Sequence, residues 1–117
     1  MAGRLTTHVL DIAQGRPGVG ITVDLWRLGG DDGPVRVTSA VTNSDGRTDS
    51  PMLSGDAFLP GQYELRFHVG PYFAGQGQAG GSLFDIVPVR FTLSDPDGHY
   101  HIPLLASAWS YTTYRGS

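Results

Sequence analysis

The residues best suited to catalysis in this sequence are histidines, and two of them, His99 and His101, lie two positions apart. Side chains two positions apart on a β-strand point to the same face, so both imidazoles would face one site. Histidine exchanges protons near neutral pH and also binds metals. The pair therefore indicates acid–base chemistry or a metal site, while a single histidine is also compatible with a structural role.

A zinc site would need a third protein ligand besides the H-x-H pair. His8 could supply that ligand if its strand lies beside the strand that carries His99 and His101. No zinc signature such as H-E-x-x-H occurs in the chain. The remaining histidine, His68, is interpreted as structural. A zinc-dependent hydrolase that uses His8, His99 and His101 stays open as an alternative.

Other catalytic groups are less clearly marked. The sequence contains no cysteine, which excludes thiolate catalysis and disulfides, and no G-x-S-x-G motif marks a nucleophilic serine. The glycine-rich segment 75–81 lacks the lysine and the spacing of a phosphate-binding loop. Arg47 follows the turn signal Asp45-Gly46, so it could point from a strand end into a cleft or be an exposed arginine.

Length and composition indicate one globular domain. With 117 residues, 39% hydrophobic and 16% charged, the chain is expected to form a single domain over 1–117. The net charge of −3 and the scattered basic residues give no indication of a nucleic-acid partner. Neither a signal peptide nor an apolar stretch of membrane-spanning length is visible, so we expect a soluble, cytoplasmic protein without a membrane partner.

Short β-rich runs separated by turn signals predict an all-β sandwich of seven to eight strands with at most one short helix. The expected strands cover 4–13, 21–28, 35–42, 61–69, 84–93, 99–107 and 109–115. A helical turn is expected only within 71–81, where the glycines disfavour a longer helix.

The alternation of side chains assigns these strands a core face and an outer face. Alternate residues from Tyr100 to Leu104 are expected in the core. The opposite face of that strand, and one face each of the first and last strands, mix polar with apolar side chains: His99, His101, His8, Leu10, Thr112 and Tyr114. A sheet with two partly apolar faces usually buries both, so we expect a second subunit to cover this one.

Three segments, in this order along the chain, resemble the transthyretin-related hydroxyisourate hydrolase family: RLTTHVLDIAQGRPG, TNSDGR and HYHIPLL followed by SYTTYRGS. The closing Tyr-Arg-Gly-Ser distinguishes these enzymes from the hormone-carrying transthyretins. The resemblance implies a transthyretin-like β-sandwich that assembles as a homotetramer, a dimer of dimers, with active sites in the channel between the dimers. It also implies hydrolysis of 5-hydroxyisourate by opening of a ring amide, which gives 2-oxo-4-hydroxy-4-carboxy-5-ureidoimidazoline in urate degradation, without a cofactor or metal.

The resemblance also implies roles for individual residues. The catalytic set is His8, Arg47 and His101: histidine activates water and returns a proton, and Arg47 stabilises the oxyanion. Which histidine is the base stays open. The implied substrate-binding residues are His8, Arg47 and Tyr114, and the implied supporting residues are His99, Thr112 and Ser117. Two non-enzymatic functions also stay open: a carrier of a small aromatic ligand and a purely structural sandwich.

Overall fold

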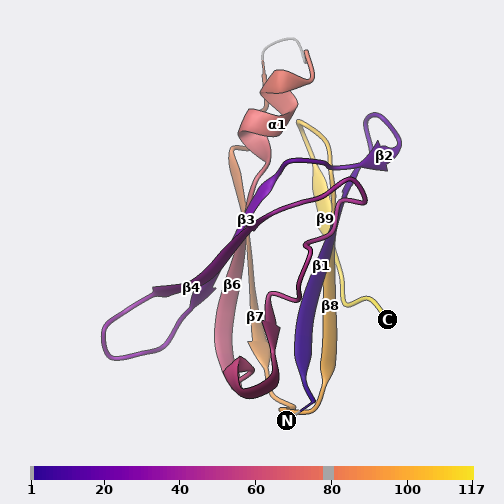
Figure 1. Ribbon diagram of the computed structural model, residues 1–117. Coiled ribbons are helices and arrows are strands. Elements are labelled where there is room, and N and C mark those ends of the chain that lie inside the picture. Colours follow the sequence, from indigo (N-terminus) through magenta and orange to yellow (C-terminus); the bar gives the residue numbers. More distant parts are fainter. Residues whose placement is uncertain (1, 78–80) are drawn as a thin grey trace.

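The computed structural model describes residues 2–77 and 81–117 and consists of two β-sheets packed face to face (Figure 1). The strands are β1 (Arg4–Asp11), β2 (Arg16–Pro17), β3 (Thr22–Arg27), β4 (Val35–Val41), β5 (Leu53–Ser54), β6 (Gly61–His68), β7 (Ile86–Leu93), β8 (His99–Ala106) and β9 (Tyr111–Thr113). A 3-10 turn, η1, covers Gly55–Ala57, and a helix, α1, covers Val69–Gly75. The predicted all-β sandwich with one short helix is confirmed, and the described residues form nine strands where seven to eight were expected, because the two-residue strands β2 and β5 add to the expected set.

The first sheet has the strand order β2-β1-β8-β9, and β5 also pairs with β1. Its central pair, β1 and β8, is parallel, and its register runs from Arg4 opposite His99 to Asp11 opposite Ala106. The second sheet has the order β4-β3-β6-β7 with antiparallel pairs throughout. The β1–β8 register matters for function, because it brings the two histidine-bearing strands side by side.

The core lies between the sheets and is built from alternate residues of the strands. Leu5 and Val9 of β1 and Leu104 of β8 are inaccessible or nearly so, as are Leu65 and Phe67 of β6. Burying a side chain of this size contributes about 1.5–3 kcal/mol. Because these residues occupy one face of each strand, the intervening residues of β1 and β8 must face outward, which confirms the predicted faces of these two strands. The predicted face is wrong for Tyr114, which lines a cavity with core-facing residues of β8.

The ends of several elements differ from the expected ranges for local reasons. β1 ends at Asp11, because the Asp11 carboxylate accepts hydrogen bonds from the backbone N–H groups of Ala13 and Gln14 and closes a turn. Only Tyr111–Thr113 of the expected final strand is extended, since Ser107 and Ser110 join in a turn before it.

The helix also begins earlier than expected. α1 starts at Val69 and shortens the expected strand 61–69 by one residue, while part of the expected helical segment, 78–80, lies outside the described residues. In the described part of the chain, no helix is long and apolar enough to cross a membrane.

Candidate active site

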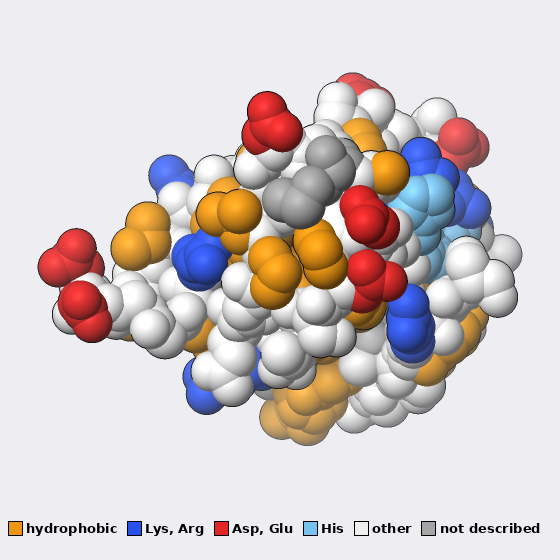
Figure 2. All heavy atoms as spheres, turned by 90° about the horizontal axis from the view of Figure 1, so that it is seen from below, with side chains coloured by type: hydrophobic (Ala, Val, Ile, Leu, Met, Phe, Trp, Pro, Cys, Tyr) orange, Lys and Arg blue, Asp and Glu red, His pale blue; other side chains and the backbone are white. Residues whose placement is uncertain are grey.

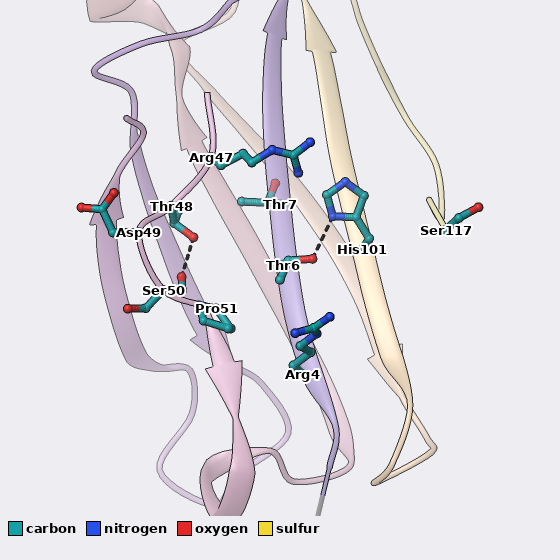
Figure 3. Close-up of a pocket in the computed structure, with 10 residues that line it drawn as sticks. All are labelled: Arg4, Thr6, Thr7, Arg47, Thr48, Asp49, Ser50, Pro51, His101 and Ser117. Carbon is teal, nitrogen blue, oxygen red and sulfur yellow. Dashed lines mark hydrogen bonds between the residues drawn. The ribbon is translucent and has the colours of Figure 1, made fainter. Parts of the chain in front are cut away.

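The outward face of the first sheet borders a cavity of about 410 Å³ (Figure 3). Its lining includes Arg4, Thr6, Arg47, Asp49, His101 and Ser117. These residues come from β1, from the segment between β4 and β5, from β8 and from the C-terminal end. The cavity therefore joins parts of the chain that are distant in sequence, and its size suits a small-molecule ligand.

Two parallel strands position the histidines. The register places Thr6 of β1 opposite His101 of β8, and the Thr6 hydroxyl shares a hydrogen bond of 2.8 Å with Nδ1 of His101. His8 lies two residues beyond Thr6 on the same face, and its Nε2 donates to the backbone carbonyl of Asp45 at 2.8 Å. A carbonyl oxygen only accepts, so Nε2 of His8 carries a proton and only Nδ1 is left to exchange one.

The turn before Arg47 places this residue beside β1. The Asn43 side chain accepts hydrogen bonds within the turn, including one from the Arg47 backbone N–H at 3.2 Å. Gly46 has a φ of +76°, and a Cβ there would collide with the carbonyl oxygen of Val9. A β-bridge joins Arg47 to His8. The Asp-Gly turn signal thus has a physical reason: only glycine permits the close approach that brings Arg47 beside the histidines.

The surroundings of His101 favour its neutral form. Partial burial lowers the pKa of His101 below its ordinary value of 6.5, and the positive charges of Arg47 and His8 lower this pKa further. His101 is consequently neutral at pH 7 and able to accept a proton, as a general base must.

The two guanidinium groups that line the cavity, those of Arg4 and Arg47, form no ion pair in the described residues. The Asp49 carboxylate accepts instead from the side-chain amide of Asn43 at 3.0 Å. Figure 2 shows histidine side chains next to blue basic side chains on one side of the molecule. Such a cavity suits an anionic or carbonyl-rich ligand, to which guanidinium groups can donate hydrogen bonds.

Within one chain, not all of the predicted site residues come together. His101, Arg47 and Ser117 line the cavity, and His8 lies beside Arg47. Tyr114 instead lines a second cavity of about 380 Å³, with Phe91, Tyr100 and other residues of β7, β8 and β9.

His99 and Thr112 do not line the first cavity either. Among residues 2–77 and 81–117, no group of three His, Asp or Glu side chains has the arrangement needed to hold a metal ion, so His99 does not complete a three-histidine site with His8 and His101.

Sequence reasoning missed most residues of the cavity lining, among them Arg4 and Thr6 of β1. Both lie on the same face of β1 as His8, Thr6 two positions and Arg4 four positions before it. The alternation that selected His8 could have selected them as well. The pairing of Thr6 with His101, however, depends on the parallel register, which sequence alternation does not determine.

A profile of the HIUase/Transthyretin family matches residues 5–116. The 5-hydroxyisourate hydrolase of Deinococcus radiodurans is 54% identical over 114 residues, which cover 97% of this chain and 95% of that protein. The crystal structure of (S)-allantoin synthase superposes with a TM-score of 0.92 at 45% identity, and the match covers 99% of this chain but 44% of that chain.

Two further solved structures separate similarity of fold from similarity of sequence. The 5-hydroxyisourate hydrolase of Klebsiella pneumoniae has a TM-score of 0.82 and 34% identity, and the match covers 98% of this chain and 99% of that chain. Transthyretin from Sparus aurata has a TM-score of 0.88 but 25% identity, with coverage of 97% and 96%. The fold is common to both, whereas in sequence this chain is more similar to the hydrolases.

Proposed function

The chain belongs to the HIUase/Transthyretin family, and on this basis we propose that it hydrolyses 5-hydroxyisourate in urate degradation. One observation carries the assignment: His101 and Arg47 line one cavity, and His8 is bridged to Arg47, in a chain that is 54% identical to a 5-hydroxyisourate hydrolase. An enzyme that opens a cyclic amide needs a base for water, a cation for the oxyanion and a proton for the leaving nitrogen. These three side chains can supply all of them.

We assign His101 as the general base. It removes a proton from a water molecule while that water attacks the ring amide carbonyl of the substrate. Its lowered pKa keeps the imidazole neutral at pH 7 and so able to accept this proton. Positioned acid–base catalysis of this kind accelerates a reaction by about 10²–10⁴-fold.

Arg47 and His8 complete the proposed reaction. Negative charge develops on the carbonyl oxygen during attack, and the Arg47 guanidinium donates hydrogen bonds to it. The C–N bond then breaks, the ring nitrogen takes up a proton, and the product carries a new carboxylate. We assign this proton to Nδ1–H of protonated His8, whose Nε2–H stays on the Asp45 carbonyl. The proton that His101 took from water is then released to solvent, and His8 takes up another for the next cycle.

A homotetramer with active sites between its two dimers is part of the proposal. In a single chain Tyr114 lies away from the cavity of His101, so we assign its contact with the substrate to a neighbouring subunit. Mixing two inactive variants, His101→Asn and Tyr114→Ala, tests this assignment. Mixed tetramers should regain activity, because the Tyr114→Ala subunit keeps His101 and receives Tyr114 from its neighbour. No regain in confirmed mixed tetramers would contradict it.

The experiment that tests the function is the ultraviolet decay of 5-hydroxyisourate, freshly generated from urate. The protein should accelerate the decay, and a chelator should leave the rate unchanged. A rate abolished by the chelator would favour the zinc-dependent hydrolase, and no acceleration by the folded protein would contradict hydrolase activity altogether. The His101→Asn variant is the matched control for uncatalysed decay.

A further inference from the structure

The imidazole of His101 is contacted by two residues that the proposed reaction does not use. On one side, the Thr6 hydroxyl shares a hydrogen bond of 2.8 Å with Nδ1. On the other side, Gly116 lies so close that a Cβ at this position would be 2.6 Å from Cδ2 of the ring. The backbone N–H of Gly116 also donates to the carbonyl oxygen of His101 at 2.7 Å. The ring is therefore held between β1 and the C-terminal end of the chain.

We propose that Thr6 and Gly116 are positioning residues that together form a clamp on the His101 imidazole and direct its Nε2 into the cavity. The catalytic role of this clamp rests on the proposed function. Its geometry is independent of that function, because it follows from the contacts of the ring alone. In Figure 3 the second ring nitrogen points away from Thr6, toward the end of the cavity where Arg47 lies.

A threonine hydroxyl suits this position because it can both donate and accept. Toward neutral His101 it donates to the lone pair of Nδ1 or accepts from Nδ1–H, and toward the imidazolium it accepts from Nδ1–H. When the proton of the neutral ring is on Nδ1, the Thr6 hydroxyl accepts it in a hydrogen bond, and Nε2 can gain a proton while this bond persists. The parallel register of β1 and β8 places the two side chains opposite each other, so no loop movement is needed to form the bond.

The requirement for glycine at position 116 comes from the lack of space for a side chain and not from the backbone conformation. In the described residues, the glycines with positive φ do not include Gly116, so its backbone is accessible to other residues. What excludes a side chain is the imidazole, because a contact of 2.6 Å between two carbon atoms requires one of them to move. Glycine near the chain terminus thus lets the backbone lie against the ring and limits its rotation.

The charged and titratable groups around the clamp define its expected pH behaviour. They are Arg4 and His8 on β1, and Arg47 and Asp49 on the segment between β4 and β5. A hydrogen bond from the imidazolium to Thr6 is charge-assisted and hence stronger than one from the neutral ring. Removing the hydroxyl should therefore disfavour the protonated form and lower the pKa of His101.

The test begins with Thr6→Val, which keeps the shape of the side chain and removes the hydroxyl. We expect kcat to fall about 10-fold to 100-fold, as for a misplaced catalytic group, with KM changed less, and the acid limb of the pH–rate profile to move to lower pH. Thr6→Ser restores the hydroxyl and should recover most of the loss. Ser39→Ala is the matched control, because it removes a hydroxyl that donates to Asp24 on the second sheet, away from both cavities.

Gly116→Ala tests the other side of the clamp. The added methyl should turn the ring so that Nε2 no longer points into the cavity. This should lower kcat and change the ¹⁵N signals of the His101 ring. These signals are assigned by their absence in His101→Asn. The proposed clamp would be overturned if both variants, Thr6→Val and Gly116→Ala, had the kcat, the pH profile and the His101 signals of the wild type.

These outcomes are independent of the proposed function. If the wild-type protein does not accelerate decay of 5-hydroxyisourate, the function fails, while the ¹⁵N signals and the pKa of His101 still decide the clamp. If Thr6→Val does not fold, Thr6→Ser and Gly116→Ala remain to test it.

Discussion

Two outward faces of this molecule carry ionisable side chains: the face of the first sheet around His101 and the face of the second sheet around Glu64. On the second sheet the charges compensate one another. Buried Glu64 accepts from Nε of Arg66 at 2.6 Å and from Nη2 of Arg90 at 3.1 Å. The bond from Arg66 is the main cause that holds the pKa of Glu64 below its ordinary value, against the opposing effect of burial.

A second pair on the same face is compensated as well. Asp24 accepts hydrogen bonds from the hydroxyl of Ser39 and from Nε2 of His68, the latter at 2.9 Å. Burial tends to raise the pKa of Asp24, but these hydrogen bonds and the charge of His68 together lower it. His68 is thus a structural histidine, as predicted from the sequence.

The first sheet shows the opposite arrangement. Arg4 and Arg47 have no carboxylate partner in the described ranges, and positive neighbours lower the pKa of His101. A compensated network stabilises the fold, whereas like charges gathered at a cavity cost free energy unless a ligand compensates them. The comparison indicates that the role of a histidine or an arginine, structural or catalytic, depends on whether a carboxylate pairs with it. Matched substitutions on the two faces test this conclusion.

The largest expected effect is on catalysis. His101→Asn should lower kcat by about 10²–10⁴-fold, because it removes the proposed general base, while the protein stays folded. The matched variant His68→Asn should leave kcat unchanged and lower the melting temperature, because it disturbs the bond to Asp24. Both are measured by ultraviolet decay of 5-hydroxyisourate and by thermal unfolding. A fully active His101→Asn enzyme would contradict the assignment of His101 as the general base.

Arginine substitutions give the next largest effect. Arg47→Gln removes the proposed oxyanion donor and should reduce kcat by about 10²–10³-fold, the usual loss for such a donor. Arg90→Gln removes a guanidinium of equal charge from the second sheet, where it only supports Glu64, and should leave kcat near the wild-type value. Equal losses in both variants would mean that net charge, and not the position of Arg47, governs the rate.

Part of this contrast could be predicted from the sequence. The alternation of β1 and β8 assigns His8 and His101 to an outward face, and the Asp45-Gly46 turn indicates that Arg47 follows a tight reversal. These signals are local, because each depends only on residues that are close together in the chain. The family resemblance then supplied the reaction and the combination of the three residues.

The rest depends on contacts between distant segments. The hydrogen bond from Thr6 to His101 joins residues 95 positions apart and requires the parallel register of the two strands. The reason for Gly116 is a contact with the His101 ring that becomes visible only when the chain end folds back onto β8. Likewise, alternation along β9 does not reveal that Tyr114 faces a different cavity from His101 in one chain.

A smaller effect, on stability, is expected on the second sheet. Glu64→Gln should lower the free energy of unfolding by about 1–3 kcal/mol, the usual cost of losing hydrogen bonds to a charged group, and leave kcat unchanged. Because the pKa of Glu64 is lowered in the folded state, its stabilisation is present above the ordinary value of 4.5 and is lost as the pH falls through the folded-state pKa. Urea unfolding at several pH values should show the difference between variant and wild type narrowing in acid. A difference independent of pH would contradict this ionic role.

The smallest expected change is a gradual loss of activity in mild acid. One experiment can distinguish this effect of the His101 face from the effect of acid on the stability of the second sheet. The base form of His101 is lost as the pH falls through its pKa, which lies below 6.5, so kcat/KM should decline in that range. The lowered pKa values of Asp24 and Glu64 keep the second sheet charged and paired down to more acidic pH, so folding should persist there. Rate and circular dichroism measured on the same samples should therefore diverge: activity falls first while the β-signal stays constant, and it returns on neutralisation. If the two decline together, acid acts through unfolding, and the lowered pKa of His101 does not govern the rate.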